Sequence, residues 1–308
     1  GSFGWCMADY NTHREFGSGD RICYHGMLDM FRNPKLSAAV YASQKTPRSP
    51  SDIVLEVSSG MALGDLPGGA PTACWVFTNA ESVRLYRGND YIAAFSPDRH
   101  GRFAAMPHPP IEINDFVGSL LEKYEGMDPP SAQAAAAILN DMRRCAMELS
   151  PLSKARMLSL RLSWNEVARM YCKYIGILGS PSPVYRFEAV WHGRVVGTVV
   201  REPVQSVRLE CTVHNPILTD GPTWDCAAVS LRAIDQNGNL LPYCGEAVQL
   251  RVDGPLKIIG PSVVPLRGGM AGTYLATTGE AGRAVLHCRM EGALDTDAVL
   301  TIRSRENG

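Results

Sequence analysis

The sequence predicts a mainly β protein with a helical insertion, and three observations support this fold class. From Asp52 onward, short segments of alternating apolar and polar residues recur, and turn residues separate them. The 29 glycines and 21 prolines provide the many turns that such short strands need. One stretch, about residues 113–178, has helix-start signals and helical spacing in place of the alternation.

Length and composition limit the class of protein further. The 308 residues suggest two or three domains, and 45% apolar with 20% charged residues is an ordinary globular balance. Lys and Arg number 30 against 31 Asp and Glu, without a basic run, so we expect no nucleic-acid partner. No apolar run reaches the ~18–20 residues needed to cross a bilayer, so we expect no membrane role.

The first 48 residues are predicted to form a short strand, a loop and a helix. Ser2 to Ala8 is an apolar, glycine-containing stretch that indicates a strand, and polar and aromatic residues follow from Asp9. A helical stretch ends near Tyr41. The next segment, 46–51, has the composition of a linker, because its two prolines prevent a continuing helix.

Residues 49–202 are predicted to form an immunoglobulin-like sandwich that contains the helical insertion. Its strands are expected at 53–57, 74–78, 82–86, 91–95, 184–190 and 195–200, with a Gly/Pro-rich loop at 60–71. Such β-branched and aromatic segments, joined by turns, are typical of a small antiparallel sandwich.

The insertion is predicted to contain three or four helices. Helix starts are expected at Asn114-Asp115, at Pro129-Pro130-Ser131 and at Ser150-Pro151. A capping box, in which Ser163 and Glu166 bond each other's backbone, predicts a further start. One face of that last helix is apolar and carries Val167, Met170, Tyr171 and Tyr174.

Residues 203–308 are predicted to form a second, C-terminal immunoglobulin-like sandwich without catalytic features. Apolar positions from Ala227 to Ala233 alternate with Ala228, Ser230 and Arg232, and a turn follows at 235–239. The glycine-rich stretch 267–272 lacks the Lys-Ser/Thr of a phosphate-binding loop, so a turn between strands is expected there.

Metal and disulfide chemistry are not indicated. The seven histidines show no ligand spacing, so we expect neither a metal site nor a cofactor. The nine cysteines are scattered, without a Cys-x-x-Cys pair, which favours reduced thiols in the cytoplasm. The N-terminus has no signal-peptide pattern.

The segment around Trp5 is the best candidate for a functional site. An apolar strand that opens into an aromatic and polar loop suits the C-terminal end of a barrel strand, where (β/α)-barrel enzymes keep their sites. The alternative is that Trp5 is a core aromatic residue and the loop is ordinary surface.

Several motifs closely resemble glycoside hydrolase family 2, and most of all its β-galactosidase branch. They cover essentially the whole chain: residues 1–13, 19–26, 33–35, 39–41, 77–86 (FTNAESVRLY), 107–110 (PHPP), 171–176 (YCKYIG), 185–189 (YRFEA), 260–261, 267–270 (RGGM) and 272–274 (GTY).

This resemblance implies that residues 1–48 are the last β/α unit of a catalytic (β/α)8 TIM barrel. It implies a retaining glycosidase acting on β-galactosides or related oligosaccharides, whose two catalytic carboxyl groups lie roughly 5 Å apart. In the family the two glutamates follow earlier barrel strands, so no residue of this chain is assigned a catalytic role. The chain would then need the N-terminal catalytic portion of the same enzyme as its partner. The sequence leaves open whether the enzyme forms a homo-oligomer.

The resemblance also implies a sugar-binding role for five residues. Trp5 matches the family's tryptophan at the end of strand eight, whose ring stacks on the C–H face of the sugar. Asp9, Asn11 and His13 would touch substrate or line the rim of the pocket, and His25 would form part of its wall. The cation that pairs with a uronic acid in the β-glucuronidase branch has no counterpart near His25, which disfavours such substrates.

Two other interpretations stay open. The chain could be a carbohydrate-binding or scaffold module of tandem immunoglobulin-like domains, or a separate subunit that completes another chain's barrel. Sugar-binding sandwiches expose aromatic residues, whereas we expect four tryptophans here at core positions: Trp75, Trp164, Trp191 and Trp224.

Overall fold

The structure is a computed structural model that describes residues 4–13, 15, 19, 21–58, 74–145, 148–176 and 182–304. The predicted loop 60–71, Ser2 and Phe3 lie outside the described residues. Contacts divide the chain into two compact units. We call Gly1–Ala38 with Val204–Gly308 the terminal unit, and Ala39–Pro203 the middle unit. The domain borders expected from composition stay predictions.

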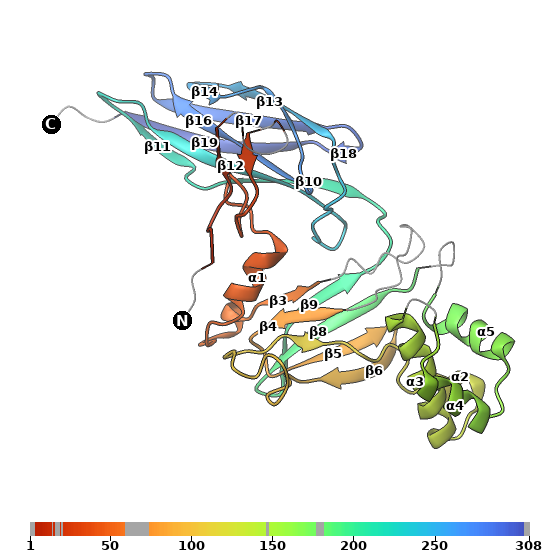
Figure 1. Cartoon of the computed structure of the whole chain (residues 1–308). Coiled ribbons are helices and arrows are strands. Elements are labelled where there is room, and N and C mark those ends of the chain that lie inside the picture. Colours follow the sequence, from red (N-terminus) through yellow and green to blue (C-terminus); the bar gives the residue numbers. More distant parts are fainter. Residues whose placement is uncertain are drawn as a thin grey trace. The chain divides into compact units, whose positions relative to one another are not determined.

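The middle unit contains two antiparallel sheets that share one core (Figure 1). The three-stranded sheet has the order β3 (Leu55–Val57), β4 (Trp75–Thr78), β7 (Ile111–Glu112). The four-stranded sheet has the order β6 (Asp90–Phe95), β5 (Ser82–Arg87), β8 (Tyr185–Trp191), β9 (Arg194–Arg201). Buried side chains from both sheets, among them Val76, Leu85 and Phe187, form the core, so the predicted strands pack as a sandwich.

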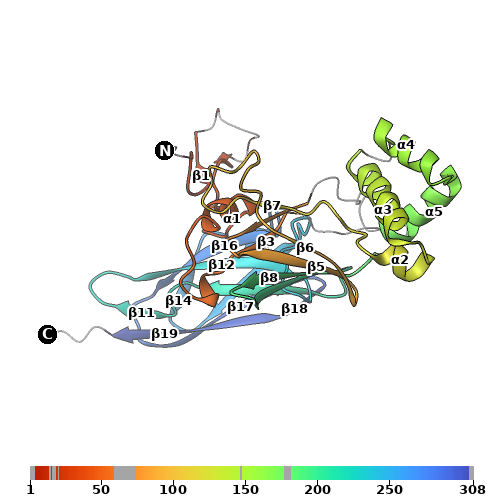
Figure 2. The same ribbon diagram turned by 90° about the horizontal axis from the view of Figure 1, so that it is seen from below.

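Four helices lie between β7 and β8, where three or four were predicted: α2 (Leu120–Glu125), α3 (Pro129–Arg144), α4 (Pro151–Ser159) and α5 (Trp164–Tyr174). The start expected at Asn114-Asp115 is wrong, because α2 begins only at Leu120 and Asp115 instead closes a turn by accepting the Val117 and Gly118 N–H groups. Figure 2 shows the four helices gathered at one end of the unit's sheets. Their apolar faces belong to the same core as the strands. A 3-10 turn, η1 (Pro50–Asp52), precedes β3 in the linker.

The capping box at α5 is confirmed. The Glu166 carboxylate accepts the Ser163 backbone N–H at 2.7 Å, and the Ser163 hydroxyl accepts the Glu166 N–H at 3.3 Å. The buried residues of α5 are the four expected ones: Val167, Met170, Tyr171 and Tyr174. Local signals are thus sufficient to position this helix.

The terminal unit contains a sandwich of two five-stranded sheets (Figure 1). One has the order β14 (Leu256–Ile259), β16 (Met270–Thr277), β12 (Cys226–Ile234), β10 (Val207–Val213), β18 (Ala293–Leu294). The other has the order β11 (Ile217–Asp220), β19 (Thr296–Ser304), β17 (Gly282–Met290), β13 (Ala247–Asp253), β15 (Val263–Pro265). β10 with β18 and β11 with β19 pair in parallel, and the other neighbours are antiparallel.

The alternation predicted for β12 is confirmed, with one informative exception. Its inward residues from Ala227 to Ala233 are buried in the sandwich core. Ser230 faces outward and is nevertheless only 6% exposed, because the loop 29–33 covers it. The turn expected at 267–272 is present, with positive φ at Gly268 and Gly269.

The strand expected up to Ala8 is not formed in the described residues from Gly4 onward. Ala8 makes one isolated parallel bridge with Leu28, and the first strands are the short β1 (Tyr10–Asn11) and β2 (Ile22–Cys23). A strand needs a neighbour along its length, and here only residues 27–28 pair with the segment. The helix expected to end near Tyr41 is α1 (Leu36–Ala42).

The fold class is therefore confirmed as mainly β with few helices. In the described part of the chain, no helix is both long and apolar enough to cross a membrane.

The expected burial of four tryptophans is wrong for two of them. Trp164 is 47% exposed because it begins α5 outside the buried face of that helix. Trp224 is 60% exposed in the loop between β11 and β12. Trp75 and Trp191 are half-buried.

Candidate functional site

The candidate site is the segment from Gly4 to Lys35, which belongs to the terminal unit. Its backbone folds back on itself, and β1 pairs with β2 so that Tyr10 lies opposite Cys23. Further in, the Asp9 N–H donates to Leu28 O at 3.0 Å and the Leu28 N–H donates to Met7 O at 2.9 Å. These bonds tie residues 7–9 to Leu28, beyond the short β1–β2 pair.

Asp9 holds this segment together from the inside. Its side chain is buried, and its Oδ1 accepts hydrogen bonds from the Gly26 N–H at 2.8 Å and from Lys35 Nζ at 2.7 Å. Lys35 also donates to Tyr24 O at 3.3 Å. A buried carboxylate needs such charged and backbone partners, so Asp9 links three parts of the segment.

A glycine is required at position 26 because the backbone there lies very close to the backbone of Asp9 and Leu28. A Cβ atom on Gly26 would lie 2.2 Å from Asp9 N and 2.5 Å from Leu28 O. Both obstacles are backbone atoms, so a larger residue would push the two chain segments apart.

Trp5 lies on the surface of this scaffold beside Tyr10. Its side chain is 77% exposed, and its Nε1–H donates to the Tyr10 hydroxyl at 3.4 Å. The Cys23 thiol raises the pKa of Tyr10 above its ordinary value of 10.0. Two exposed aromatic rings joined in this way offer an apolar face with a polar edge.

The other predicted site residues take different positions. Asn11 pairs with Ile22 in the β1–β2 ladder, His13 accepts the Glu15 N–H at 3.3 Å, and His25 precedes Gly26. All three are exposed, whereas Asp9 is buried in its ion pair. The structure thus joins Trp5 with Tyr10 and joins Asp9 with Lys35, and it leaves Asn11, His13 and His25 at the surface.

The loop 29–33 fixes the segment to the C-terminal sandwich. Asp29 stabilises the loop by accepting the N–H groups of Phe31 and Asn33, both at 2.8 Å. Asn33 Nδ2 then donates to Ala271 O on β16 at 2.9 Å, and Ser230 Oγ on β12 donates to Phe31 O at 3.0 Å.

Phe31 packs where β16 has a glycine. Its ring centroid lies 5.8 Å from that of Tyr274. A Cβ atom on Gly272 would lie 2.3 Å from Phe31 Cγ and 2.5 Å from Val229 O. The outer face of β12 and β16 is therefore shaped to receive this loop.

Five residues that the sequence reasoning did not select as site residues carry this arrangement: Tyr10, Gly26, Phe31, Asn33 and Lys35. Tyr10, Gly26, Asn33 and Lys35 lie in stretches that resemble the family, and the opposite charges of Asp9 and Lys35 are a further sequence signal. Among the described residues, no group of three or more His, Cys, Asp or Glu side chains is arranged to hold a metal ion.

The chain is similar to curated β-galactosidases along most of its length. It is 30% identical over 272 residues to the β-galactosidase of Thermoanaerobacterium thermosulfurigenes, which covers 87% of this chain and 30% of that protein. It is 28% identical to that of Rhizobium meliloti over 95% of this chain and 31% of that protein. The chain thus spans about a third of the length of these relatives. The predicted resemblance is confirmed. No family model matches the chain.

Solved structures share the fold. A β-glycosidase from Bacteroides vulgatus superposes with a TM-score of 0.58 at 13% identity, covering 96% of this chain and 30% of that one. A β-glucuronidase of glycoside hydrolase family 2 superposes with a TM-score of 0.54 at 13% identity, covering 99% of this chain and 25% of that one.

Proposed function

We propose that this chain is the C-terminal portion of a retaining β-galactosidase and that it supplies one wall of the sugar pocket. The observation that carries the proposal is the exposed Trp5–Tyr10 pair, held on a segment that Asp9, Lys35 and Gly26 fix from within. The similarity to curated β-galactosidases over most of the chain supports the same reaction class.

In this proposal Trp5 binds the apolar C–H face of a terminal galactosyl residue. An aromatic ring on a rigid support gives such a face a large contact at little conformational cost. Asn11, His13 and His25 are exposed and provide polar groups at the rim. The ion pair with Lys35 gives Asp9 a positioning role, because its Oδ1 already accepts two hydrogen bonds.

The proposal assigns both catalytic glutamates to the remainder of the enzyme, on earlier strands of a barrel that residues 1–48 would complete. Two carboxyl groups about 5 Å apart would perform the retaining reaction there. The nine cysteines are free thiols, which supports a reducing, cytoplasmic setting for this enzyme.

Activity assays on two proteins test this function. The 308-residue chain and the longest open reading frame that includes it would each be purified and incubated with p-nitrophenyl β-D-galactopyranoside. We expect hydrolysis only by the longer protein. In that protein Trp5→Ala should lower kcat/KM about 100-fold or more through lost sugar contact, whereas Trp164→Ala should leave it unchanged.

Three results would contradict the proposal. They are turnover by the 308-residue chain alone, absence of β-galactosidase activity in the longer protein, and an unaffected Trp5→Ala variant. If the reading frame encodes this chain alone, co-purification with a catalytic partner and activity only on mixing would identify a separate subunit.

A further inference from the structure

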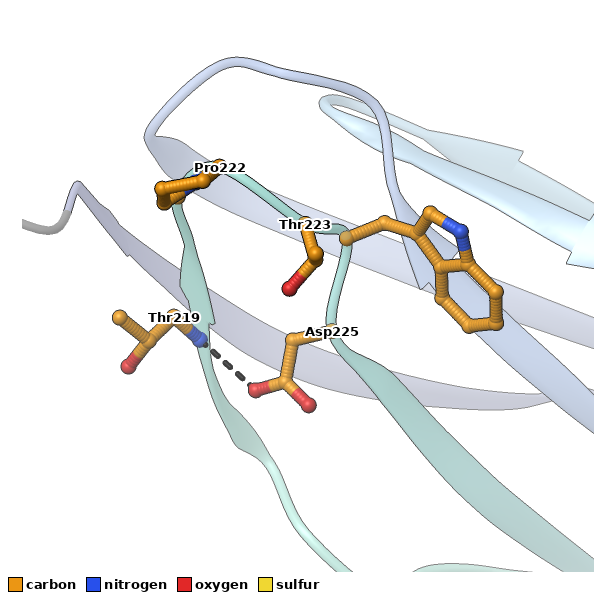
Figure 3. A pocket seen from close by; sticks show the side chains of 6 residues that line it. Thr219, Pro222, Thr223 and Asp225 are labelled. Carbon is orange, nitrogen blue, oxygen red and sulfur yellow. Dashed lines mark hydrogen bonds between the residues drawn. The ribbon is translucent and has the colours of Figure 1, made fainter.

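The two sheets of the C-terminal sandwich are joined by polar contacts near the loop between β11 and β12. Asp225, just before β12, accepts the Thr219 N–H of β11 at 2.9 Å (Figure 3), and Asp220 of β11 accepts the Gly279 N–H that follows β16 at 2.8 Å. β11 belongs to one sheet, whereas β12 and β16 belong to the other. Farther along β12, level with Leu231, two cysteines face each other from the two sheets.

Cys211 lies on β10 and Cys288 lies on β17, in opposite sheets. Cys288 is buried in the core of the sandwich, and Cys211 is half-buried against the same core. Both are free thiols, and the Cys288 thiol donates a hydrogen bond to Cys211 Sγ with the two sulfurs 3.8 Å apart. A disulfide has an S–S length of about 2.05 Å, so the sulfurs need to approach by less than about 2 Å to be joined.

A hydrogen bond between the sheets holds β10 in place at this level. Thr296, the partner of Cys288 in the β17–β19 ladder, donates from its Oγ1 to Leu209 O on β10 at 2.7 Å. The Leu209 side chain is buried in the core and lies on the same face of β10 as Cys211, because alternate residues of a strand share a face. β10 is thus fixed opposite β17 and β19, which keeps the two sulfurs within reach of each other.

Cys211 is the sulfur that a small oxidant in solution reaches first. β18 pairs only with Val207 and Arg208 of β10, so within the described residues no strand covers this side of β10 at Cys211. The hydrogen bond from Cys288 lowers the pKa of Cys211 below its ordinary value of 9.0, although burial opposes this, and the same bond together with burial raises the pKa of Cys288. Because the thiolate is the reactive form of cysteine, Cys211 is the nucleophile of the pair.

We propose that Cys211 and Cys288 form a disulfide between the two sheets when hydrogen peroxide oxidises the chain. The Cys211 thiolate attacks one peroxide oxygen and breaks the O–O bond, which gives a sulfenic acid and a hydroxide ion that takes up the proton Cys211 had lost. The Cys288 sulfur then attacks the Cys211 sulfur, and the displaced hydroxyl group leaves as water with the Cys288 proton. Two thiols lose two electrons, and one peroxide is reduced to two water molecules.

The disulfide would lock the sandwich, because it closes the chain between residues 211 and 288 across both sheets. Closing such a long loop restricts the unfolded chain far more than the folded one. We therefore expect oxidation to raise the thermal midpoint of the terminal unit by about 5–10 °C.

Peptide mapping of the 308-residue chain tests this proposal. The folded, reduced chain would be treated with hydrogen peroxide, its remaining thiols blocked with iodoacetamide in denaturant, and the product digested without reductant. We expect linked peptides that contain Cys211 and Cys288 and that dithiothreitol separates. Cys211→Ser should remove both the link and the rise in midpoint. Cys226→Ser is the matched control, because Cys226 also lies in the terminal unit but is exposed, and it should keep both.

Three results would overturn the proposal. They are oxidation of the exposed cysteines without a link between Cys211 and Cys288, a link that forms only after denaturation, and a link that leaves the thermal midpoint unchanged. Cys211→Ala provides a second variant without the thiol, and the midpoints of both reduced variants show whether they are folded. Neither the β-galactosidase assay nor Trp5→Ala affects this outcome, so the disulfide and the proposed function fail or stand separately.

Discussion

Gly272 is the residue at which the candidate site meets the C-terminal sandwich. It lies opposite Ser230 in the β12–β16 ladder, and both face the loop 29–33. The ring of Phe31 occupies the space that a side chain at position 272 would need. Two hydrogen bonds, from Asn33 to Ala271 and from Ser230 to Phe31, fix the orientation of the loop on the sheet.

We therefore expect Gly272→Ala to destabilise the terminal unit by about 1–3 kcal/mol, the usual cost of overpacking a tight contact. Chemical denaturation followed by circular dichroism would measure the loss. Gly245→Ala is the matched control, because a Cβ atom there has no neighbour within 4 Å and its φ is not positive. Equal stability of the two variants would show that the loop does not pack on β16 as described.

At the level of single residues, the sequence pointed to Trp5 but not to the residues that hold its segment in place. Trp5 stands out by residue type and by its motif, whereas Lys35 is an ordinary lysine until its Nζ is seen 2.7 Å from Asp9. Phe31 and Gly272 come together from opposite ends of the chain. Neither periodicity nor composition reports such contacts, so this part of the site could not be predicted.

Among the elements, the helices were the most predictable because their signals are local. Ser150 and Ser163 cap α4 and α5 as their sequence positions indicated. The strand expected at the start of the chain could not be predicted from local signals, because a strand forms only where another segment pairs with it. Beyond their caps, the helices are joined by charged contacts that cross from α2 to α5.

Glu125 at the end of α2 is the centre of these contacts. It accepts hydrogen bonds from Arg169 at 2.8 Å, from Lys173 at 2.8 Å and from the Tyr174 hydroxyl at 2.7 Å. The hydrogen bond from Arg169, followed by those from Lys173 and Tyr174, lowers the pKa of Glu125 to about 2. Because the pKa is below its ordinary value of 4.5, this stabilisation is complete above pH 4.5 and is lost as the pH falls toward 2.

We expect Glu125→Gln to lower the free energy of unfolding by about 1 kcal/mol at pH 7, since solvent screens the half-exposed Arg169 and Lys173. The difference from the unaltered chain should shrink between pH 4.5 and pH 3. Urea unfolding at pH 7, 4 and 3 measures this. Glu122→Gln on the same helix is exposed and should have no such pH-dependent effect. A difference that stays constant with pH would contradict the role of the ion pairs.

At the scale of the whole chain, the first 38 residues group with the last 105 (204–308) rather than with residues 39–203, which follow them directly. Each unit has its own cluster of buried apolar residues, one around Leu85 and Phe187 and the other around Leu231 and Leu286. A unit with its own core can lose its structure without the other, so the chain should not behave as a single two-state system.

We therefore expect differential scanning calorimetry of the 308-residue chain to resolve two unfolding transitions. Gly272→Ala should lower the midpoint of one transition and Glu125→Gln that of the other, because the two residues lie in different units. In the double variant both shifts should appear with the same size as in the single variants, as is usual for distant sites. Tryptophan fluorescence assigns the transitions, since Trp5 and Trp224 belong to the terminal unit and Trp75, Trp164 and Trp191 to the middle unit. One transition moved by both substitutions would mean that the two cores unfold together, and the division into independent units would then be wrong.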